Sequence, residues 1–216
     1  MQFQRVFGQT FGLETTIAEV VFGLVLAAMI IAFIASWRRR RQGEPPSRRA
    51  SRNRLEISYA LGLTGMAIFL IITSFSANTS FFRDPPPDMT VKVIAFQWCW
   101  DFQYPAQSVS VSAQCRGKAT PTLVLPAGRP VRIEMTSNDV IHSFWVPGIR
   151  FKMDIFPHHV NSFTVTLHDG RWVGHCAEFC GIYHDEMMFH LQAVPPAQFD
   201  RWIRARESQA TKAGTS

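Results

Sequence analysis

The segment VVFGLVLAAMIIAFIASW, Val20–Trp37, contains eighteen residues and no charged side chain. About 20 apolar residues cross a bilayer at a rise of roughly 1.5 Å per residue, and the helical pattern extends back to Thr15. A second uncharged run, rich in Leu, Ile, Phe and Met, extends from Ile57 to Ser80. A core helix of a soluble protein would carry a polar face, and neither run has one. The sequence therefore predicts transmembrane helices over residues 15–37 and 55–80.

The positive charge of the chain is concentrated in the loop between these two runs. The chain has 22 Lys and Arg residues against 16 Asp and Glu, a net charge of +6, and eight of the arginines lie in residues 38–54. Loops rich in arginine stay in the cytoplasm. We therefore expect the N-terminal segment, residues 1–14, and everything after the second helix to be extracytoplasmic. Anionic lipid headgroups, and not nucleic acid, are the expected partners of these arginines.

A signal peptide that is cleaved within this sequence is not expected. In a signal peptide the positive charges precede the apolar run, whereas here they follow it and only Arg5 precedes it. The pattern instead predicts a multi-pass membrane protein, whose far side would be the periplasm or cell exterior in a bacterium and the intermembrane space in an organelle.

A proline-rich linker, residues 81–89, is followed by a region of β-type composition. Between residues 90 and 194, short β-branched and aromatic runs alternate with turn signals such as Asp169-Gly170. This spacing is typical of a sandwich or barrel. The expected strands are the run TVKVIAFQWCWDFQY, which begins at Thr90, and residues 122–125, 131–136, 142–146, 160–166, 171–173 and 188–194. The last region, residues 195–216, is expected to form a helix through Glu207 and then a disordered tail.

The segment GHCAEFCGIYHDEMM, Gly174–Met188, gathers possible metal ligands within fifteen residues. A disulfide is one interpretation of its two cysteines, because thiols outside the cytoplasm usually pair, but it leaves His184 and Met187 without a role. Structural zinc makes little use of a thioether, and a blue-copper site uses only one cysteine. Two thiolates can instead bridge two copper ions, with His184 and the distant His142 as terminal ligands. The segment therefore predicts an electron-relay centre with two coppers.

The pattern Cys-x-Glu-x-Cys-x3-His-x2-Met, preceded by HSFW at residues 142–145, resembles subunit II of the haem–copper cytochrome c oxidases, most of all its actinobacterial members. The resemblance covers nearly the whole chain. It implies a membrane-anchored all-β protein, in which an N-terminal two-helix transmembrane hairpin is followed by a cupredoxin-like Greek-key β-barrel and a C-terminal helix. It also implies the binuclear copper centre CuA, with metal ligands at His142, Cys176, Glu178, Cys180, His184 and Met187.

The resemblance assigns roles to further residues. Trp98, the first tryptophan of FQWCW, corresponds to the residue that admits the electron, although a tryptophan at a barrel rim can also simply pack. The carboxylate of Glu178 corresponds to a ligand of Mg or Mn shared with subunit I. Glu56, at the cytoplasmic start of the second helix, corresponds to the mouth of a proton path, and its alternative role is an acid at the headgroup boundary.

The implied partners are oxidase subunits I and III, membrane lipids, and cytochrome c or a cytochrome c domain of a neighbouring bc-type complex. Single electrons would pass from the cytochrome to haem in subunit I, where oxygen is reduced to water and protons are translocated. A subunit II of a quinol oxidase would lack the copper ligands. The competing interpretations are a CuA domain of another respiratory reductase and a membrane copper-binding or copper-transfer protein.

Two cysteines lie outside this pattern. Cys99 and Cys115 face an oxidising compartment, so a cross-strand disulfide between them is one expectation. The alternative is that Cys99 packs as a small apolar residue.

Overall fold

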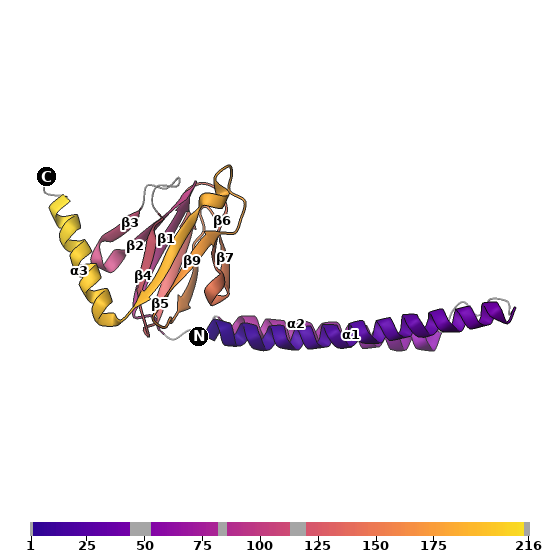
Figure 1. Ribbon diagram of the computed structural model, residues 1–216. Helices are drawn as coiled ribbons and strands as arrows, with labels where there is room; N and C mark the ends of the chain where they lie inside the picture. The colour runs from indigo at the N-terminus through magenta and orange to yellow at the C-terminus, as the bar shows by residue number, and fades with distance from the viewer. Residues whose placement is uncertain (1, 44–52, 82–85, 113–119, 214–216) are drawn as a thin grey trace. The chain divides into compact units, whose positions relative to one another are not determined.

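The computed structural model describes residues 2–43, 53–81, 86–112 and 120–213 (Figure 1). The chain divides into two compact units. One unit comprises residues 6–80 and is helical. The other comprises residues 1–5 and 81–216 and is called here the β-unit, because residues 89–194 of it are built from strands that one helix follows. Each unit is described by itself.

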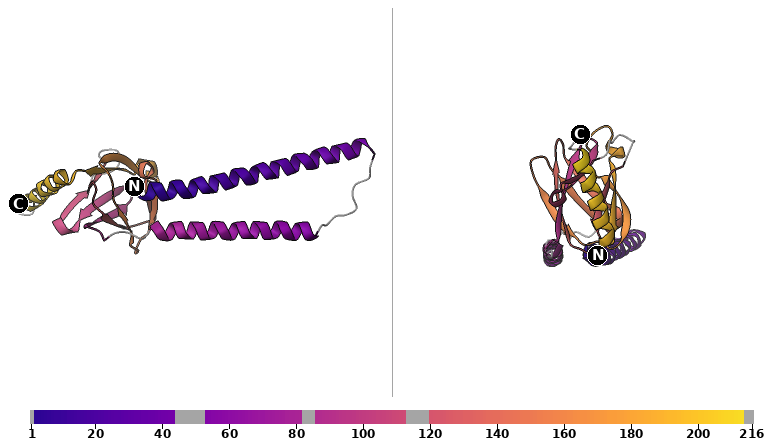
Figure 2. Two further views of the ribbon diagram at one scale, coloured as in Figure 1. Left: turned by 90° about the horizontal axis from the view of Figure 1, so that it is seen from below. Right: turned by 90° about the vertical axis from the view of Figure 1, so that its left-hand side faces the viewer.

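The helical unit consists of α1 (Gln2–Arg41) and α2 (Asn53–Phe81), which run antiparallel (Figure 2). The hydroxyl of Ser74 donates a hydrogen bond of 3.3 Å to the carboxylate of Glu14 and links the two helices. Both helices are long and apolar enough to cross a membrane. Their large side chains are exposed, with Phe22 and Phe33 at 69% and 70%. Exposure of this kind is stable where lipid takes the place of water.

The helix bounds differ from those expected from the sequence. Helix α1 begins at Gln2, so it includes most of the segment assigned to residues 1–14, and it continues past Trp37 to Arg41. Most of the arginine-rich loop, residues 44–52, lies outside the described residues. An arginine adds little cost at the end of a helix, because straight-chain residues favour the helical state and cations stabilise its C-terminus.

The described part of the β-unit contains ten strands in two five-stranded sheets. The first sheet has the order β3-β2-β1-β5-β8 and the second the order β4-β10-β9-β6-β7. The pairs β1–β5 and β4–β10 are parallel, and the other neighbours are antiparallel. The strands are β1 (Met89–Phe96), β2 (Cys99–Tyr104), β3 (Val109–Ser112), β4 (Thr122–Pro126), β5 (Val131–Ser137), β6 (His142–Val146), β7 (Phe151–Ile155), β8 (Asn161–Val165), β9 (Gly170–Cys176) and β10 (Met188–Val194).

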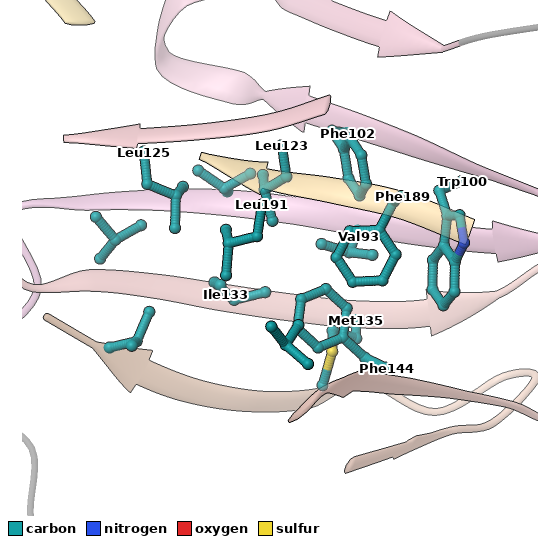
Figure 3. Close-up of a cluster of buried hydrophobic side chains, with 14 of the residues drawn as sticks. Val93, Trp100, Phe102, Leu123, Leu125, Ile133, Met135, Phe144, Phe189 and Leu191 are labelled. Atoms are coloured by element: carbon teal, nitrogen blue, oxygen red, sulfur yellow. The ribbon is translucent and has the colours of Figure 1, made fainter. Parts of the chain in front are cut away.

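The hydrophobic core draws on both sheets (Figure 3). Period-2 alternation directs one face of each strand inward, as in β1, where Val91, Val93 and Ala95 are fully buried. Phe189 of β10 packs against Phe144 of β6, with ring centroids 4.6 Å apart. Gly174 makes this packing possible, because a Cβ atom there would lie 2.1 Å from the Phe189 ring.

Tyr104 connects the two sheets. Its hydroxyl donates to the carbonyl of Val124 at 2.8 Å and accepts from the amide of Val124 at 3.0 Å, so β2 is tied to β4. Burial raises the pKa of Tyr104 well above its ordinary value. The last helix, α3 (Pro196–Ala213), places Phe199 and Trp202 against the Tyr104 ring. These contacts attach α3 to the β-unit.

The predicted fold class is confirmed, and several details are corrected. The run that begins at Thr90 forms two strands with a turn at residues 97–98, so Cys99 opens β2 and does not lie in the first strand. Strands β3 and β7 were not predicted. Helix α3 extends to Ala213, through residues that were expected to be a disordered tail, because hydrogen bonds between successive turns continue the helix without apolar contacts.

The second pair of cysteines is described only in part. Cys99 is buried and disulfide-bonded, which excludes the alternative of a free thiol that only packs. Cys115 lies outside the described residues. Its pairing with Cys99 therefore stays a prediction.

Candidate metal centre

Three loops converge on the predicted metal site. They are the β1–β2 turn (residues 97–98), the β5–β6 loop (residues 138–141) and the segment between β9 and β10, called here the cysteine loop (residues 176–187). Pairing of β6 with β9 sets Phe144 opposite Cys176. Because His142 opens β6 and Cys176 closes β9, this register brings the histidine to the first cysteine from 34 residues away.

The two cysteine sulfurs lie at the centre of the cluster. Their separation is 3.8 Å, and neither cysteine forms a disulfide, whose sulfurs would be about 2.05 Å apart. The Sγ atom of Cys176 lies 3.7 Å from Nδ1 of His142, and that of Cys180 lies 3.4 Å from Nδ1 of His184. A histidine nitrogen therefore stands beside each sulfur.

Two weaker donors complete the group. The Sδ atom of Met187 lies 3.8 Å from Sγ of Cys180, and the backbone oxygen of Glu178 lies 3.3 Å from Sγ of Cys176. The six residues predicted as ligands thus lie around one pair of sulfurs. Four of them, His142, Cys176, Cys180 and Met187, are buried, and His184 and Glu178 are half-buried.

The donor set fits a soft metal. A thiolate–metal bond is about 2.3 Å long, as known for zinc, so one ion can contact two sulfurs up to roughly 4.6 Å apart. The observed separation of 3.8 Å is within this limit. Nδ1 of His142 and the two cysteine sulfurs also lie within 4.8 Å of one another. Thiolate, imidazole and thioether together favour copper that cycles through Cu(I) over hard cations.

The two thiols differ in acidity. Burial alone would raise the pKa of Cys176, but hydrogen bonds with His142 and with the backbone at Glu178 and Ser143 outweigh it and lower that pKa to about 7. Burial and the negative charge of Cys176 raise the pKa of Cys180. We therefore expect the metal-free site to lose its first proton from Cys176, since a second thiolate beside the first is unfavourable without a cation.

The carboxylate of Asp139 contacts the ring nitrogen of His142 that faces away from Cys176. Oδ1 of Asp139 lies 2.9 Å from Nε2 of His142, and Oδ2 accepts a hydrogen bond of 2.7 Å from the backbone amide of Gln97. Burial opposes both charges. Hydrogen bonds with Gln97, His142 and Val140 outweigh it and lower the pKa of Asp139, and hydrogen bonds with Cys176 and Asp139 raise the pKa of His142. Neither Asp139 as a partner of His142 nor Gln97 was identified from the sequence. The spacing of Asp139 three residues before His142 is the one signal that could have indicated the first contact.

Trp98 lies against the cysteine loop. Its indole Nε1 donates to the carbonyl oxygen of Cys180 at 3.2 Å, and the side-chain amide of Gln97 donates to the same oxygen at 2.7 Å. Gly181 has a φ of +119°, and a Cβ atom there would lie 3.2 Å from the Trp98 ring. Glycine at this position thus permits both the backbone conformation and the close approach of the indole.

The remaining predicted site residue, Glu56, lies in the first turn of α2 in the helical unit. Glu56 therefore belongs to a different unit from the cluster. The exposed apolar tip of the cysteine loop was not predicted from the sequence. Phe179 and Ile182 there are 79% and 83% exposed.

Comparisons with known proteins agree on one family. Residues 89–194 match the family described as "Cytochrome C oxidase subunit II, periplasmic domain". A probable cytochrome c oxidase subunit 2 from Streptomyces avermitilis is 31% identical over 223 residues, covering 86% of this chain and 69% of the relative. One from Nocardia farcinica is 28% identical over 262 residues, covering 91% and 70%.

Two solved structures share the fold of the β-unit. The periplasmic domain of subunit II of cytochrome oxidase (CoxB) from Bradyrhizobium japonicum is 26% identical, with a TM-score of 0.54, over 58% of this chain and 97% of that one. A mixed disulfide between the thioredoxin-like protein TlpA and a subunit II of cytochrome c oxidase also matches, at 26% identity and a TM-score of 0.50, over 58% and 95%.

The match to the Streptomyces relative extends into the helices as well as the β-unit, since it covers 86% of the chain. The two apolar helices and the periplasmic-domain match together indicate a membrane-anchored protein with an extracytoplasmic domain. The cluster of histidine and cysteine indicates that this domain binds copper. The chain belongs to the cytochrome c oxidase subunit II family and is a subunit of the cytochrome c oxidase complex.

Proposed function

We propose that this chain carries the binuclear copper centre CuA, accepts single electrons from cytochrome c and relays them to haem in subunit I. The observation that carries the proposal is the arrangement of two free thiols 3.8 Å apart, each with a histidine nitrogen within 3.7 Å. A single ion could bind two sulfurs and two histidines, as structural zinc does, but it would leave the thioether of Met187 and the carbonyl of Glu178 without a role. Two ions that share both thiolates use every one of these donors.

In this proposal the thiolates of Cys176 and Cys180 and the imidazoles of His142 and His184 would hold the two coppers. Met187 and the carbonyl of Glu178 would be weaker donors. When bound, the copper pair supplies a one-electron redox couple shared between two ions. The residues of the chain hold the donors in a buried cage, so few atoms move when the charge changes.

A closed cage suits electron relay and not substrate chemistry. Catalytic metal sites keep a coordination position open for water or substrate. Here four donors surround the sulfur pair, and four of the six donor residues are buried. We therefore assign oxygen reduction and proton translocation to the partner subunit that holds the haem.

Trp98 is the proposed point of electron uptake. Its indole is half-buried and lies one hydrogen bond from the carbonyl of Cys180, a proposed bridging residue. The Tyr183 ring packs edge-on against it, with centroids 4.8 Å apart, which limits the orientations open to the indole. A donor haem that docks over Trp98 would reach the copper pair through few bonds.

The exposed tip of the cysteine loop supports docking of protein partners. Large apolar residues that are exposed together mark interaction surfaces. Phe179 lies one residue before Cys180 and Ile182 two residues after it, and both side chains are exposed. The proposed protein partners are subunits I and III and, as electron donor, cytochrome c or a cytochrome c domain of a bc-type complex. Glu178 would share a Mg or Mn ion with subunit I, because a hard cation prefers carboxylate oxygen.

The helical unit would anchor the chain in the plasma membrane. The last turn of α1 contains four arginines, which the positive-inside rule places in the cytoplasm beside anionic lipid headgroups. Both termini and the copper domain are then extracytoplasmic. Glu56, in the first turn of α2, would lie at the cytoplasmic surface and mark the mouth of a proton path.

A thioredoxin-like reductant is a further proposed partner. A subunit II of cytochrome c oxidase has been captured in a mixed disulfide with the thioredoxin-like protein TlpA. In this chain Cys176 and Cys180 must both be reduced to bind copper as thiolates, and they face an oxidising compartment. We propose that such a reductant keeps the two thiols reduced before the metal is inserted.

The test is the electron paramagnetic resonance spectrum of the full chain, purified in detergent and loaded with copper. The proposal predicts two coppers per chain and a hyperfine pattern from one unpaired electron shared equally by two copper nuclei. A spectrum of a single Cu(II), or a chain that retains one copper or none, would overturn it.

A further inference from the structure

The carboxylate of Asp139 joins two segments of the metal site, the β1–β2 turn and the β5–β6 loop with the start of β6. Its Oδ1 atom accepts a hydrogen bond of 2.7 Å from the backbone amide of Val140 and lies 2.9 Å from Nε2 of His142. Its Oδ2 atom accepts from the backbone amide of Gln97 at 2.7 Å. The side chain is 30% exposed, so these contacts hold an ionised group at the edge of the site without burying it completely.

The contact with His142 determines which ring nitrogen carries the proton. Nδ1 of His142 faces Sγ of Cys176 and must be free of hydrogen to bind a metal there. Nε2 then carries the hydrogen, and an ionised Asp139 is an acceptor for it. A carboxylate behind a ligating histidine fixes both the tautomer and the orientation of the ring and makes the imidazole a stronger donor.

The contact with Gln97 reaches the other side of the sulfur pair. Gln97 and Trp98 both donate to the carbonyl oxygen of Cys180. One oxygen of Asp139 therefore holds His142 beside Cys176. The other oxygen holds the β1–β2 turn, whose side chains donate hydrogen bonds to the backbone of Cys180. The two sulfurs are connected through this carboxylate as well as through the cysteine loop.

We propose that Asp139 is a positioning residue that sets the geometry and the reduction potential of the copper pair and holds the Trp98 turn against it. This inference rests on the proposed dicopper function and assigns a residue outside the set of ligands. Asparagine cannot replace the carboxylate, because it offers one oxygen to donors on both sides. Its NH2 group would face either the Gln97 amide or the hydrogens of Val140 and His142.

The experiment compares Asp139→Asn with Asp185→Asn in the full chain. Asp185 is an exposed acid beside His184, the other terminal histidine, so it controls for loss of one negative charge near the metals. For Asp139→Asn we expect copper retention against a chelator to weaken by roughly 10- to 100-fold. The reduction potential should rise, because a weaker imidazole donor stabilises Cu(II) less. Both changes should be much smaller in Asp185→Asn.

A second measurement uses the metal-free chain. Hydrogen exchange at the Gln97 amide should be faster in Asp139→Asn than in the unchanged chain, and unaffected in Asp185→Asn. If Asp139→Asn does not fold, Asp139→Ala with added formate takes its place, because a small carboxylate can occupy the vacated position. Return of Gln97 protection on adding formate supports the proposal, and no return contradicts it.

The outcomes separate this inference from the proposed function. An unchanged chain without a dicopper spectrum would refute the function, while Gln97 exchange would still decide whether Asp139 holds the turn. A normal dicopper spectrum in the unchanged chain, with equal copper retention and equal potential in Asp139→Asn and Asp185→Asn, would refute the role of Asp139 alone.

Discussion

Phe189 in the core of the β-unit is fully buried, whereas Phe179 at the tip of the cysteine loop is 79% exposed. The two residues are ten positions apart in the sequence and belong to regions organised by different physics. In the core, apolar rings from both sheets pack against one another, as Figure 3 shows for Phe144, Phe189 and Trp100. In the metal region, sulfur and imidazole are buried while large apolar side chains face outward.

The contrast indicates that stability and function are located in separate parts of the same sandwich. Core packing holds β6 and β9 in the register that brings His142 to Cys176. The loops that extend beyond these strands contribute donors and little apolar burial. Changes in the core should therefore affect folding first, and changes in the loops should affect copper first.

The largest expected effect is loss of the copper pair in Cys180→Ser. A hydroxyl is a poor bridging ligand for Cu(I), so the shared-electron spectrum should disappear completely. The β-unit should remain folded, because Cys180 lies in a loop and outside every strand. Copper analysis and circular dichroism check the two parts of this prediction.

His159→Ala is the matched control, since His159 is exposed and bonds to Asn161 away from the cluster. It should keep both coppers. Two coppers with an unchanged spectrum in Cys180→Ser would show that this sulfur does not bridge.

The next effect compares the two phenylalanines directly. Phe189→Ala should lower the free energy of unfolding by about 3–5 kcal/mol, because it opens a cavity among buried rings. Phe179→Ala should change it by less than about 0.5 kcal/mol, as expected of an exposed side chain. Urea unfolding of the full chain in detergent, followed by tryptophan fluorescence, measures both. An equal loss in the free energy of unfolding in both variants would contradict the difference proposed between the core and the loop.

A smaller loss is expected for Tyr104→Phe. Removing the hydroxyl leaves the amide and carbonyl of Val124 without this partner, at a cost of about 1–3 kcal/mol in the free energy of unfolding. The copper spectrum should not change. If the copper spectrum changed while the free energy of unfolding did not, Tyr104 would belong to the metal region.

The same residue gives a pH dependence. The pKa of Tyr104 is raised in the folded chain, so the unfolded chain ionises first. The stability that Tyr104 contributes is therefore complete below about pH 10, the ordinary tyrosine value, and is lost as the pH rises from there toward the folded pKa. The difference in stability between the unchanged chain and Tyr104→Phe should shrink over that range, as urea unfolding at a series of pH values would show.

The smallest effect on structure is expected for Trp98→Phe. Phenylalanine keeps an aromatic ring but cannot donate to the carbonyl of Cys180. Electron uptake from cytochrome c should slow while the copper spectrum and the free energy of unfolding stay close to those of the unchanged chain. Stopped-flow reduction with cytochrome c measures the rate. A spectrum lost together with the rate would make Trp98 a packing residue of the site.

The same contrast explains what the sequence could predict. The ligands of the cysteine loop lie within twelve residues of one another, and their chemistry is visible in the motif Cys176–Met187. His142 could be added because its own motif resembles the family. Strands other than β3 and β7 could be predicted, because their β-branched runs are bounded by turn residues such as glycine, proline or asparagine. The two apolar helices could be predicted because no charged residue interrupts their apolar runs.

The remaining contacts depend on a turn that the sequence does not mark. Gln97 and Trp98 are not typical turn residues, so the sequence predicts one continuous strand where the structure has β1 and β2. Without that turn, nothing in the sequence places Gln97 beside Asp139, which is 42 residues away. Strand β7 was not predicted, although Lys152 and Asp154 alternate with apolar residues as in a half-buried strand. The role of Asp139 as the supporting carboxylate could therefore be recognised only from the tertiary structure.

The most direct test of the dicopper relay is a coulometric reduction of the copper-loaded full chain. Two coppers that share bridging thiolates act as one redox couple, so we predict uptake of one electron for every two coppers, with a single midpoint potential. Uptake of one electron per copper, or two separate midpoint potentials in the same range, would contradict the account, because the metals would then be independent sites.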